Sequence, residues 1–423
     1  MAEENRHEGR AFVPPPGSLV IRGGRVLDPA GGVDEVCDLA ISGGKVAGRG
    51  KNLSLDCAAK VIDARGLLVT PGIVDIHTHL YSTGGNPEAW AGEYSVFPDG
   101  FSFRSGVTTM VDAGSAGRRN FDHFRVSVID RAKTRVFAFL NIAGYGMISD
   151  MIEQHVPDFD PAATAGAAEK HRDVIVGIKS AHYWGPGWES VDRAAAAGEA
   201  AGLPIMVDFG FFVRERPYWK LVTEKLRRGD ISTHCFRATV PVADEEGRVY
   251  PYLFRARERG VLFDLGHGGG SFVFKNAAPA FRGGFYPDSV SSDLHYQSMN
   301  GAMMDMPVTM SKCLALGMPL EEVIARSTFI PARMIGRPHL GRLNPGAPGD
   351  VALWGIRRGT FGFKDSVGGR LEACDKLECE MTVMGGEVVW DLNARDAVPW
   401  EESSAEKNIR QGEFLIPPDE KGV

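Results

Sequence analysis

The sequence predicts an α/β protein in which a (β/α)8 TIM barrel is joined to a small β-sandwich domain built from both chain ends. Between residues 71 and 346, short apolar runs alternate with segments of helical periodicity, as in repeated βα units. Eight such runs occur over about 275 residues, a size typical of a TIM barrel. No GxGxxG motif follows the first run, which disfavours a doubly wound sheet. The predicted strands are residues 72–77, 107–114, 135–143, 174–180, 203–210, 230–236, 260–269 and 288–295.

Helical periodicity is clearest in five of the segments that separate these strands. Each has apolar residues on one face and is bounded by glycine, proline or polar residues, as expected of the outer helices of a barrel. The predicted helices are residues 120–134, 161–172, 189–201, 217–228 and 250–259.

Short β-type runs flank the barrel on both sides, at residues 17–70 and 347–395. Glycine pairs at 23–24, 43–44 and 385–386 separate apolar runs and are typical of hairpin turns. We expect the two flanks to form one small β domain with the barrel, residues 71–346, inserted between them, because domain ends often lie close together. Residues 1–16 and 396–423 are polar and are predicted to be terminal arms.

Composition excludes several classes of protein. The 423 residues are 43% hydrophobic and 24% charged, as in an ordinary globular protein rather than a fibrous or disordered one. A net charge of −7 gives no general attraction for nucleic acid or for an anionic membrane, and no apolar run approaches the ~20 residues of a membrane span. Six scattered cysteines and a polar N-terminus predict reduced thiols and a cytoplasmic protein. We therefore expect a small-molecule substrate, no nucleic-acid or membrane partner, and a homo-oligomer.

The strongest chemical signal is PGIVDIHTHL, in which His77 and His79 end an apolar run. Residues two apart in a strand point to the same face, so both imidazoles are expected to enter the barrel mouth. Two such histidines make half of a metal site. Surface histidines are the alternative, but a buried run that ends in the pair favours ligation.

This motif, followed by a barrel and flanked by split β segments, resembles the amidohydrolase superfamily of metal-dependent hydrolases over residues 17–395. The resemblance implies two divalent metals, expected to be Zn²⁺, and further ligands at the ends of strands four, six and eight. These positions are Lys179 in VIVGIKS, His234 in DISTHCF and Asp293 in SVSSDLH. In the family the lysine is carboxylated and bridges the metals, which requires a neutral amine in a dry pocket. The aspartate binds a metal and takes the proton from the bridging water.

Strand five departs from the family pattern, because PIMVDFGFF has Asp208 where the family usually has a histidine ligand. Asp208 could itself ligate the second metal, His182 could replace the missing histidine, or only one metal could bind tightly. Strand alternation places Asp208 with Met206 on the inward face. With Asp208 the metal centre loses the net positive charge that it would have with a neutral histidine, so its bridging water should ionise less readily.

The loop DLGHGGGSF, residues 264–272, is expected at the active-site face, where three consecutive glycines permit close backbone approach to a ligand. His267 in this loop is predicted to be a catalytic residue that donates a hydrogen bond to the substrate; a surface histidine in a flexible turn is the alternative. His295 and Tyr81 are weaker candidates. Dihydroorotases usually carry an arginine at the position of Tyr81, so this residue argues against that activity.

The segments VDAGSAG, GIKS and HGGGSF together are similar to a deacetylase-like group of amidohydrolases that are often mislabelled dihydroorotase. The resemblance implies a hydrolase that cleaves an ester or amide bond of a small carboxylic acid. In this hypothesis a metal-bound hydroxide attacks the carbonyl and Asp293 transfers the proton to the leaving group. The alternatives are a ring-amine deaminase or cyclic amide hydrolase on the same scaffold, and a non-catalytic barrel that binds a partner.

Overall fold

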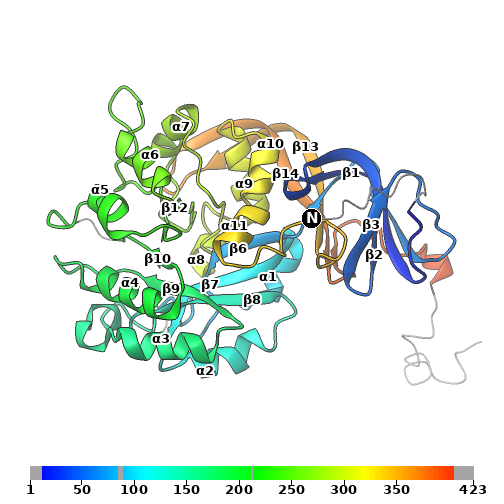
Figure 1. The fold of residues 1–423 in the computed structure, drawn as a ribbon. Coiled ribbons are helices and arrows are strands. Elements are labelled where there is room, and N and C mark those ends of the chain that lie inside the picture. The colour runs from blue at the N-terminus through cyan, green and yellow to red at the C-terminus, as the bar shows by residue number, and fades with distance from the viewer. Residues whose placement is uncertain (1–11, 84–88, 211–212, 404–423) are drawn as a thin grey trace, which may run out of the picture.

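Seven parallel strands curl into a barrel wall in which each strand pairs with its neighbours in chain order (Figure 1). The computed structural model describes residues 12–83, 89–210 and 213–403. The predicted (β/α)8 class is confirmed. The seven strands are β6 (Ile73–Thr78), β7 (Val107–Gly117), β8 (Arg135–Asn141), β9 (Ile175–Ser180), β10 (Ile205–Val207), β11 (Ile231–Ser232) and β12 (Leu262–Phe263).

The eighth predicted strand, residues 288–295, closes the barrel through isolated parallel bridges to both edges of this sheet. On one side the backbone N–H of Leu265 donates to the carbonyl of Ser289 at 3.0 Å, and on the other the N–H of His79 donates to Leu294 at 2.8 Å. The segment does not form a continuous ladder, because Asp293 has a positive φ of 49° that interrupts the extended backbone.

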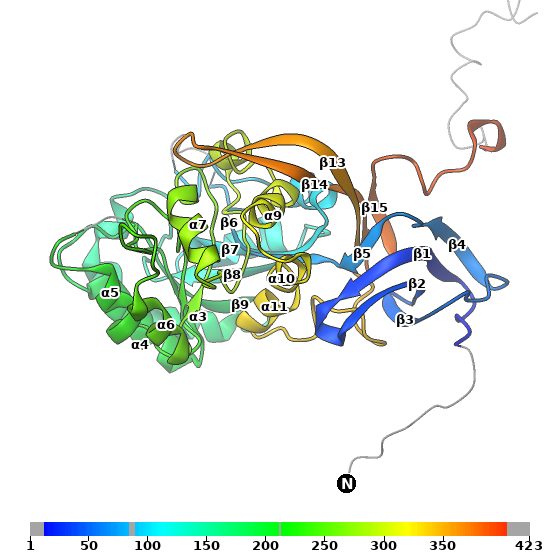
Figure 2. The same cartoon turned by 90° about the horizontal axis from the view of Figure 1, so that it is seen from above.

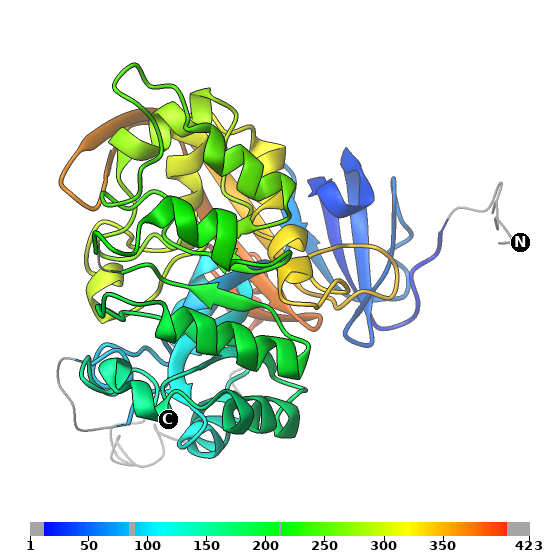
Figure 3. The ribbon, with the colours of Figure 1, turned by 60° about the vertical axis from the view of Figure 1, so that its left-hand side comes forward.

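Helices lie outside the strands, as the helices drawn in green show in Figure 3. The helix predicted at 189–201 has the predicted bounds, and Gly202 ends it in the left-handed conformation. Those predicted at 120–134 and 217–228 are shorter and continue as π-helical turns at Arg125–Ile129 and Leu221–Lys225. The α-helices are α1 (Asp99–Ser102), α2 (Phe121–Phe124), α3 (Pro161–Lys170), α4 (Glu189–Ala201), α5 (Tyr218–Lys220), α6 (Pro251–Glu258), α7 (Phe274–Arg282), α8 (Tyr296–Met299), α9 (Met306–Ala315), α10 (Leu320–Ala325) and α11 (Phe329–Met334).

Both chain ends build the second domain, which lies beside the barrel as one eight-stranded sheet. The predicted hairpins at Gly43–Gly44 and Gly385–Gly386 are confirmed. The hairpin predicted at Gly23–Gly24 is wrong: β1 continues through this pair with a bulge, and the N–H of Gly23 donates to Asp38 Oδ1 at 2.8 Å. The strands are β1 (Ser18–Asp28), β2 (Val33–Ser42), β3 (Lys45–Gly50), β4 (Ala58–Asp63), β5 (Leu68–Pro71), β13 (Val351–Lys364), β14 (Arg370–Met384) and β15 (Glu387–Asp391).

The predicted domain boundaries stay predictions, and much of both predicted arms lies outside the described residues. Among the residues that the structure describes, no helix is long and apolar enough to cross a membrane.

The hairpin of β13 and β14 extends from the small domain along the barrel, as Figure 2 shows in orange. Its tip contacts the loop that follows the glycine run. Asp365 Oδ2 accepts a hydrogen bond from the N–H of Phe274 at 3.0 Å, and the N–H of Ser366 donates to the carbonyl of Phe272 at 3.0 Å. The small domain therefore helps to position a loop at the barrel mouth.

Trp354 on β13 anchors the small domain to the barrel. Its ring is fully buried within the barrel's main hydrophobic cluster, and its Nε1 donates to Thr70 Oγ1 at 2.9 Å. A Cβ added at Gly106 would lie 2.5 Å from the Trp354 ring, so the backbone at Gly106 packs directly against this ring.

We predict that Trp354→Ala lowers the free energy of unfolding by about 3–5 kcal/mol, because it removes a large buried ring and leaves a cavity. Chemical denaturation followed by circular dichroism measures this. The control is Trp400→Ala, whose side chain is 80% exposed and whose loss should change stability by less than about 0.5 kcal/mol. Equal effects of the two substitutions would contradict an anchoring role for Trp354.

Candidate active site and metal centre

A cavity of about 190 Å³ opens at the carboxyl ends of the barrel strands. This is the face where the βα loops of TIM barrels place catalytic groups. Every metal-ligand candidate from the sequence lines it. The lining residues are His77, His79, Trp90, Met147, Lys179, His182, Asp208, His234, Arg237, Gly269, Gly270, Ser271, Asp293, His295 and Gln297.

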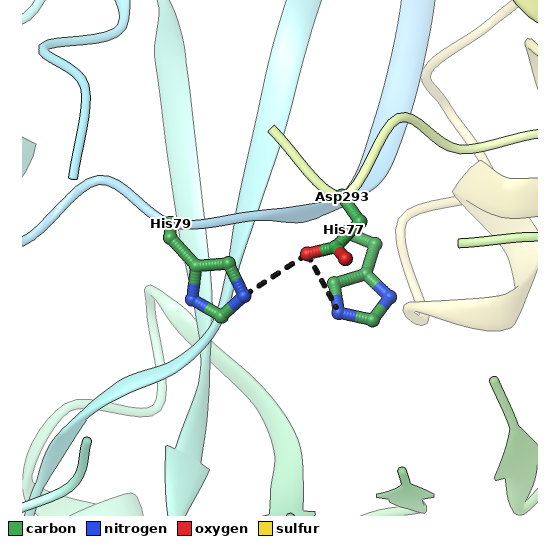
Figure 4. Close-up of side chains that lie close together, drawn as sticks. All are labelled: His77, His79 and Asp293. Atoms are coloured by element: carbon green, nitrogen blue, oxygen red, sulfur yellow. Dashed lines mark ion pairs between the residues drawn. The ribbon is translucent and has the colours of Figure 1, made fainter. Parts of the chain in front are cut away.

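His77, His79 and Asp293 form a compact, buried group (Figure 4). Asp293 Oδ1 lies 3.1 Å from His79 Nε2 and 3.6 Å from His77 Nε2. The three ligand atoms all lie within 4.8 Å of one another, as the donors of one metal ion do. Burial alone would raise the pKa of Asp293, but His77 and the neighbouring imidazoles hold it well below its ordinary value, so the carboxylate is ionised.

The far nitrogens of both imidazoles are held by polar side chains. His77 Nδ1 lies 2.9 Å from Thr233 Oγ1 and 3.2 Å from Asp264 Oδ2, and His79 Nδ1 lies 3.0 Å from Ser115 Oγ. Such partners fix the ring orientation of a metal-ligating histidine. Burial, reinforced by nearby Lys179, lowers the pKa of His77 to about 4, which keeps the imidazole neutral as a ligand must be.

Lys179, at the end of β9, is buried with its amine directed at this group. Its Nζ lies 3.3 Å from His77 Nε2 and 3.4 Å from Met206 Sδ, and the carboxylates of the cavity, Asp208 foremost, act on it only through their charge. Burial lowers the pKa of Lys179 below its ordinary value. The lowered pKa favours the neutral amine, which is the form that carbon dioxide can carboxylate.

Asp208 faces the cavity, as strand alternation predicts, and lies in a second cluster of charged groups. Its Oδ2 lies 3.3 Å from both His182 Nε2 and His234 Nε2, and its Oδ1 lies 3.3 Å from Arg237 NH1. The N–H of Gly210 also donates to Oδ1 at 2.7 Å. Burial opposes ionisation of Asp208, but His234, His182 and Arg237 together hold its pKa well below the ordinary value.

The two histidines of this cluster are also oriented from behind. His182 Nδ1 lies 2.8 Å from Glu153 Oε2, and His234 Nδ1 lies 2.7 Å from the carbonyl of Gly266. Burial would lower the pKa of His182, but Glu153 and Asp208 raise it to about 10. The described residues therefore contain one compact three-ligand group, and beside it a carboxylate that two imidazoles and a guanidinium share.

Strained backbone marks the same positions. His182, His234 and Asp293 have φ values of 50°, 57° and 49°, in the left-handed region that side chains rarely adopt. His182 and His234 lie two residues beyond the ends of β9 and β11, and Asp293 lies within the bridged segment 288–295; each turns a functional side chain into the cavity. Backbone strain of this kind is characteristic of functional sites.

The loop of residues 264–272 approaches the metal-ligand group closely. A Cβ at Gly266 would lie 2.7 Å from His234 Nδ1, and one at Gly268 would clash with Asp293 Oδ2. Both glycines have positive φ. Glycine is therefore required at these two positions for the loop to pack against the side chains of His234 and Asp293. The expected approach of the three consecutive glycines to a bound ligand stays a prediction.

The structure places His267 behind the cavity, fully buried and outside the residues that line it. Its Nε2 lies 2.7 Å from Lys312 Nζ and its Nδ1 lies 2.9 Å from the carbonyl of Gly268. Its catalytic role stays a prediction. His295 does line the cavity, whereas Tyr81 is buried with its hydroxyl 3.0 Å from His123 Nδ1.

Sequence reasoning missed Trp90, Glu153, Arg237 and Lys312. Arg237 lies only three residues beyond His234 and could have been found by reading on past the strand-six motif. Lys312 lies in an apolar helical stretch where a lysine is ordinarily assigned to the surface. Its amine donates to the carbonyl of Ala302 at 2.5 Å, and burial lowers its pKa from 10.5 to about 7.

We predict that Lys312→Met changes the pH dependence of stability. A lysine whose pKa falls on folding destabilises the native state as the pH falls from 10.5 to about 7, because protonation then favours the unfolded chain. Relative to the wild type, the variant's free energy of unfolding should therefore increase as the pH falls from 10.5 to about 7, by about 1.4 kcal/mol per unit of pKa depression. Below this range the difference between the two proteins should stay constant. Urea denaturation at several pH values measures the difference; a constant difference would show that Lys312 is protonated throughout.

Known proteins resemble this chain both in sequence and in structure. No family model matches the chain. A deacetylase from Brucella anthropi is 32% identical over 360 residues, which cover 82% of this chain and 86% of the relative. A crystal structure described as an adenine deaminase superposes with a TM-score of 0.80 at 26% identity, covering 89% of this chain and all of the other. One described as a dihydroorotase gives a TM-score of 0.77 at 29% identity, covering 89% and 98%.

Proposed function

Because the chain belongs to the amidohydrolase superfamily of metal-dependent hydrolases, we propose that it is a deacetylase-type enzyme that cleaves an ester or amide bond of a small carboxylic acid. The observation that carries this proposal is the buried group of His77, His79 and Asp293 in a cavity at the barrel mouth. The deacetylase relatives support the acyl substrate class.

The donor set fits divalent zinc. Two neutral imidazoles and one carboxylate are a usual ligand set of catalytic zinc. We propose that His77, His79 and Asp293 hold one zinc ion and that carboxylated Lys179 bridges it to a second, held by His234 and Asp208. His182, 3.3 Å from the same Asp208 oxygen, is the alternative ligand there. Bound zinc would supply Lewis-acid activation of water and of the scissile carbonyl.

The chain's own residues provide the proton transfer and the orientation. In this proposal Asp293, ionised and directed into the cavity, accepts the proton of the attacking water and returns it to the leaving group. Asp264 and Thr233 hold the ring of His77, whose other ring nitrogen lies 3.6 Å from Asp293 Oδ1. His267, which we propose as a further catalytic residue, would have to act from behind the glycine loop, where Lys312 now contacts it.

Deamination of a ring amine, or hydrolysis of a cyclic amide, is the second candidate, because the two superposed structures are described as an adenine deaminase and a dihydroorotase. Lys179 favours the two-metal hydrolase, since the deaminases of this superfamily more often use one metal and lack this lysine. Cytoplasmic location and a homo-oligomeric state are also part of the proposal.

We predict that the zinc-loaded protein hydrolyses small acetyl esters or amides, and that His77→Ala together with His79→Ala removes at least one metal per chain and lowers kcat/KM by more than about 1,000-fold. Elemental analysis and acetate release measure the two effects. The matched control is His339→Ala, an exposed histidine whose loss should change neither value.

Ammonia release from adenine, without acetate release from any ester or amide, would instead support the deaminase. Unchanged metal content in the double variant would contradict the ligand assignment, and metal binding without turnover of either substrate class would support a non-catalytic barrel.

A further inference from the structure

A second cavity lies away from the barrel mouth, between α9, the turn that follows α8, and the hairpin of β13 and β14. Its volume is about 260 Å³. It shares no lining residue with the cavity at the barrel mouth, and no residue of the proposed metal centre reaches it. The occupant of this hairpin cavity therefore has to be inferred from its own walls.

One part of the wall is apolar and aromatic. Phe361 and Phe363 lie two residues apart on β13, so their rings are on the same face of the strand. Val308 of α9 lines the cavity as well. Met304 is 51% exposed at its edge and has a φ of 64°, which side chains rarely adopt. A ligand with an apolar body would remove this exposed surface from water.

The polar part of the wall is basic. Three lysines line the cavity, and no carboxylate of the described residues does. Lys312 is fully buried, with its amine held by His267 Nε2 at 2.7 Å and by the carbonyl of Ala302 at 2.5 Å. Burial lowers the pKa of Lys312 to about 7, so we assign the positive charge of the wall to Lys364 and Lys376.

Lys364 and Lys376 lack partners of their own. Lys364 ends β13 and is exposed, whereas Lys376 of β14 is half-buried. Within residues 12–83, 89–210 and 213–403, neither amine takes part in a hydrogen bond or an ion pair. Each ammonium carries three N–H donors, which are therefore available to an anion.

Two carboxylates lie near the hairpin cavity, but backbone groups already use them. Asp305 Oδ1 accepts the N–H of Val308 at 2.7 Å at the start of α9, and Asp365 Oδ1 accepts the N–H of Gly369 at 2.6 Å in the hairpin turn. Burial raises the pKa of Asp305, and the charge of Lys376 opposes this without a direct contact. The two lysines thus remain in excess over the carboxylates that line the site.

The walls are held in place before any ligand binds. The N–H of Leu377 on β14 donates to Ser311 Oγ on α9 at 2.9 Å, and the tip of the hairpin is tied to Phe274 through Asp365. Leu377 is itself fully buried. A preformed cavity loses little conformational entropy when it binds a small molecule.

We infer that the hairpin cavity is a second binding site, for a small organic anion that carries a carboxylate on an apolar ring. The carboxylate is bound by the ammonium groups of Lys364 and Lys376, and the ring packs against Phe361 and Phe363. This site goes beyond the proposed hydrolase function and does not depend on it. Buried Lys312 lies between the bound molecule and the loop of residues 264–272, because its amine contacts His267.

The test measures calorimetric binding of phenylacetate and of its neutral counterpart phenylacetamide to the full-length protein. Lys364→Gln together with Lys376→Gln removes both charges from the wall, and Lys364→Arg together with Lys376→Arg retains them. The matched control is Lys45→Gln together with Lys275→Gln, two exposed lysines that do not line the cavity. Crystals soaked with 4-bromophenylacetate locate the ligand by the anomalous signal of bromine.

For the wild type we expect phenylacetate to bind about 10-fold more tightly than phenylacetamide, because only the anion forms charge-assisted hydrogen bonds with the lysines. The double glutamine variant should lose this preference by weakening phenylacetate alone. The double arginine variant and the control should keep it. The bromine peak should lie in the hairpin cavity, in contact with Phe361 or Phe363.

Equal affinity of the wild type for the two compounds would overturn the inference. Binding of phenylacetate that is as tight in the double glutamine variant as in the wild type would do the same, as would a bromine peak at the barrel mouth only. Circular dichroism melts of all three double variants show whether a loss of binding reflects unfolding. A folded glutamine variant that no longer prefers the anion, beside an arginine variant that does, supports the site.

Discussion

Burial of several carboxylates at one end of the barrel is the constraint on which the site depends. A buried ionised carboxylate is costly unless donors or cations surround it. Asp293 meets this requirement with two imidazoles, and Asp208 with two more and a guanidinium. The positive φ values of His182, His234 and Asp293 and the glycines of the 264–272 loop follow from the need to bring the groups within contact. The backbone strain is thus offset by electrostatic attraction.

The small domain contributes to the same arrangement from outside the barrel. Trp354 fixes its sheet to the barrel core, and the hairpin tip at Asp365 holds the backbone beyond the glycine loop. Phe272 and Phe274 are thereby tied to the second domain, while Gly268 packs against Asp293. A loop that carries three glycines in a row is intrinsically mobile. Anchoring both of its sides gives the cavity a defined wall, which substrate selection requires.

The fold and the metal-ligand candidates could be predicted because they depend on periodicity. His77, His79 and Lys179 follow apolar runs, and strand ends meet at one face of a barrel. Asp293 follows the polar segment DSVSS, and its assignment as a ligand, like that of Lys179, came from the resemblance to the amidohydrolase superfamily. The bulge at Gly23–Gly24 could not be told from a hairpin, since both use glycine at positive φ. In a hairpin the two halves of β1 would pair with each other, whereas in the bulge both halves pair with β2, and the sequence does not show which partner is used. Arg237 and Lys312 depend on where loops and helix faces lie in space, which local sequence does not encode.

Carboxylation of Lys179 and its binding of zinc, together with His77, His79 and Asp293, can be tested in one experiment. This is a crystal structure of protein grown with zinc and bicarbonate, with anomalous data collected at the zinc edge. We expect an anomalous peak in contact with His77, His79 and Asp293, and continuous density for a carboxyl group on Lys179 Nζ that reaches the same peak. A bare amine at Lys179, or an anomalous peak away from these three side chains, would contradict it.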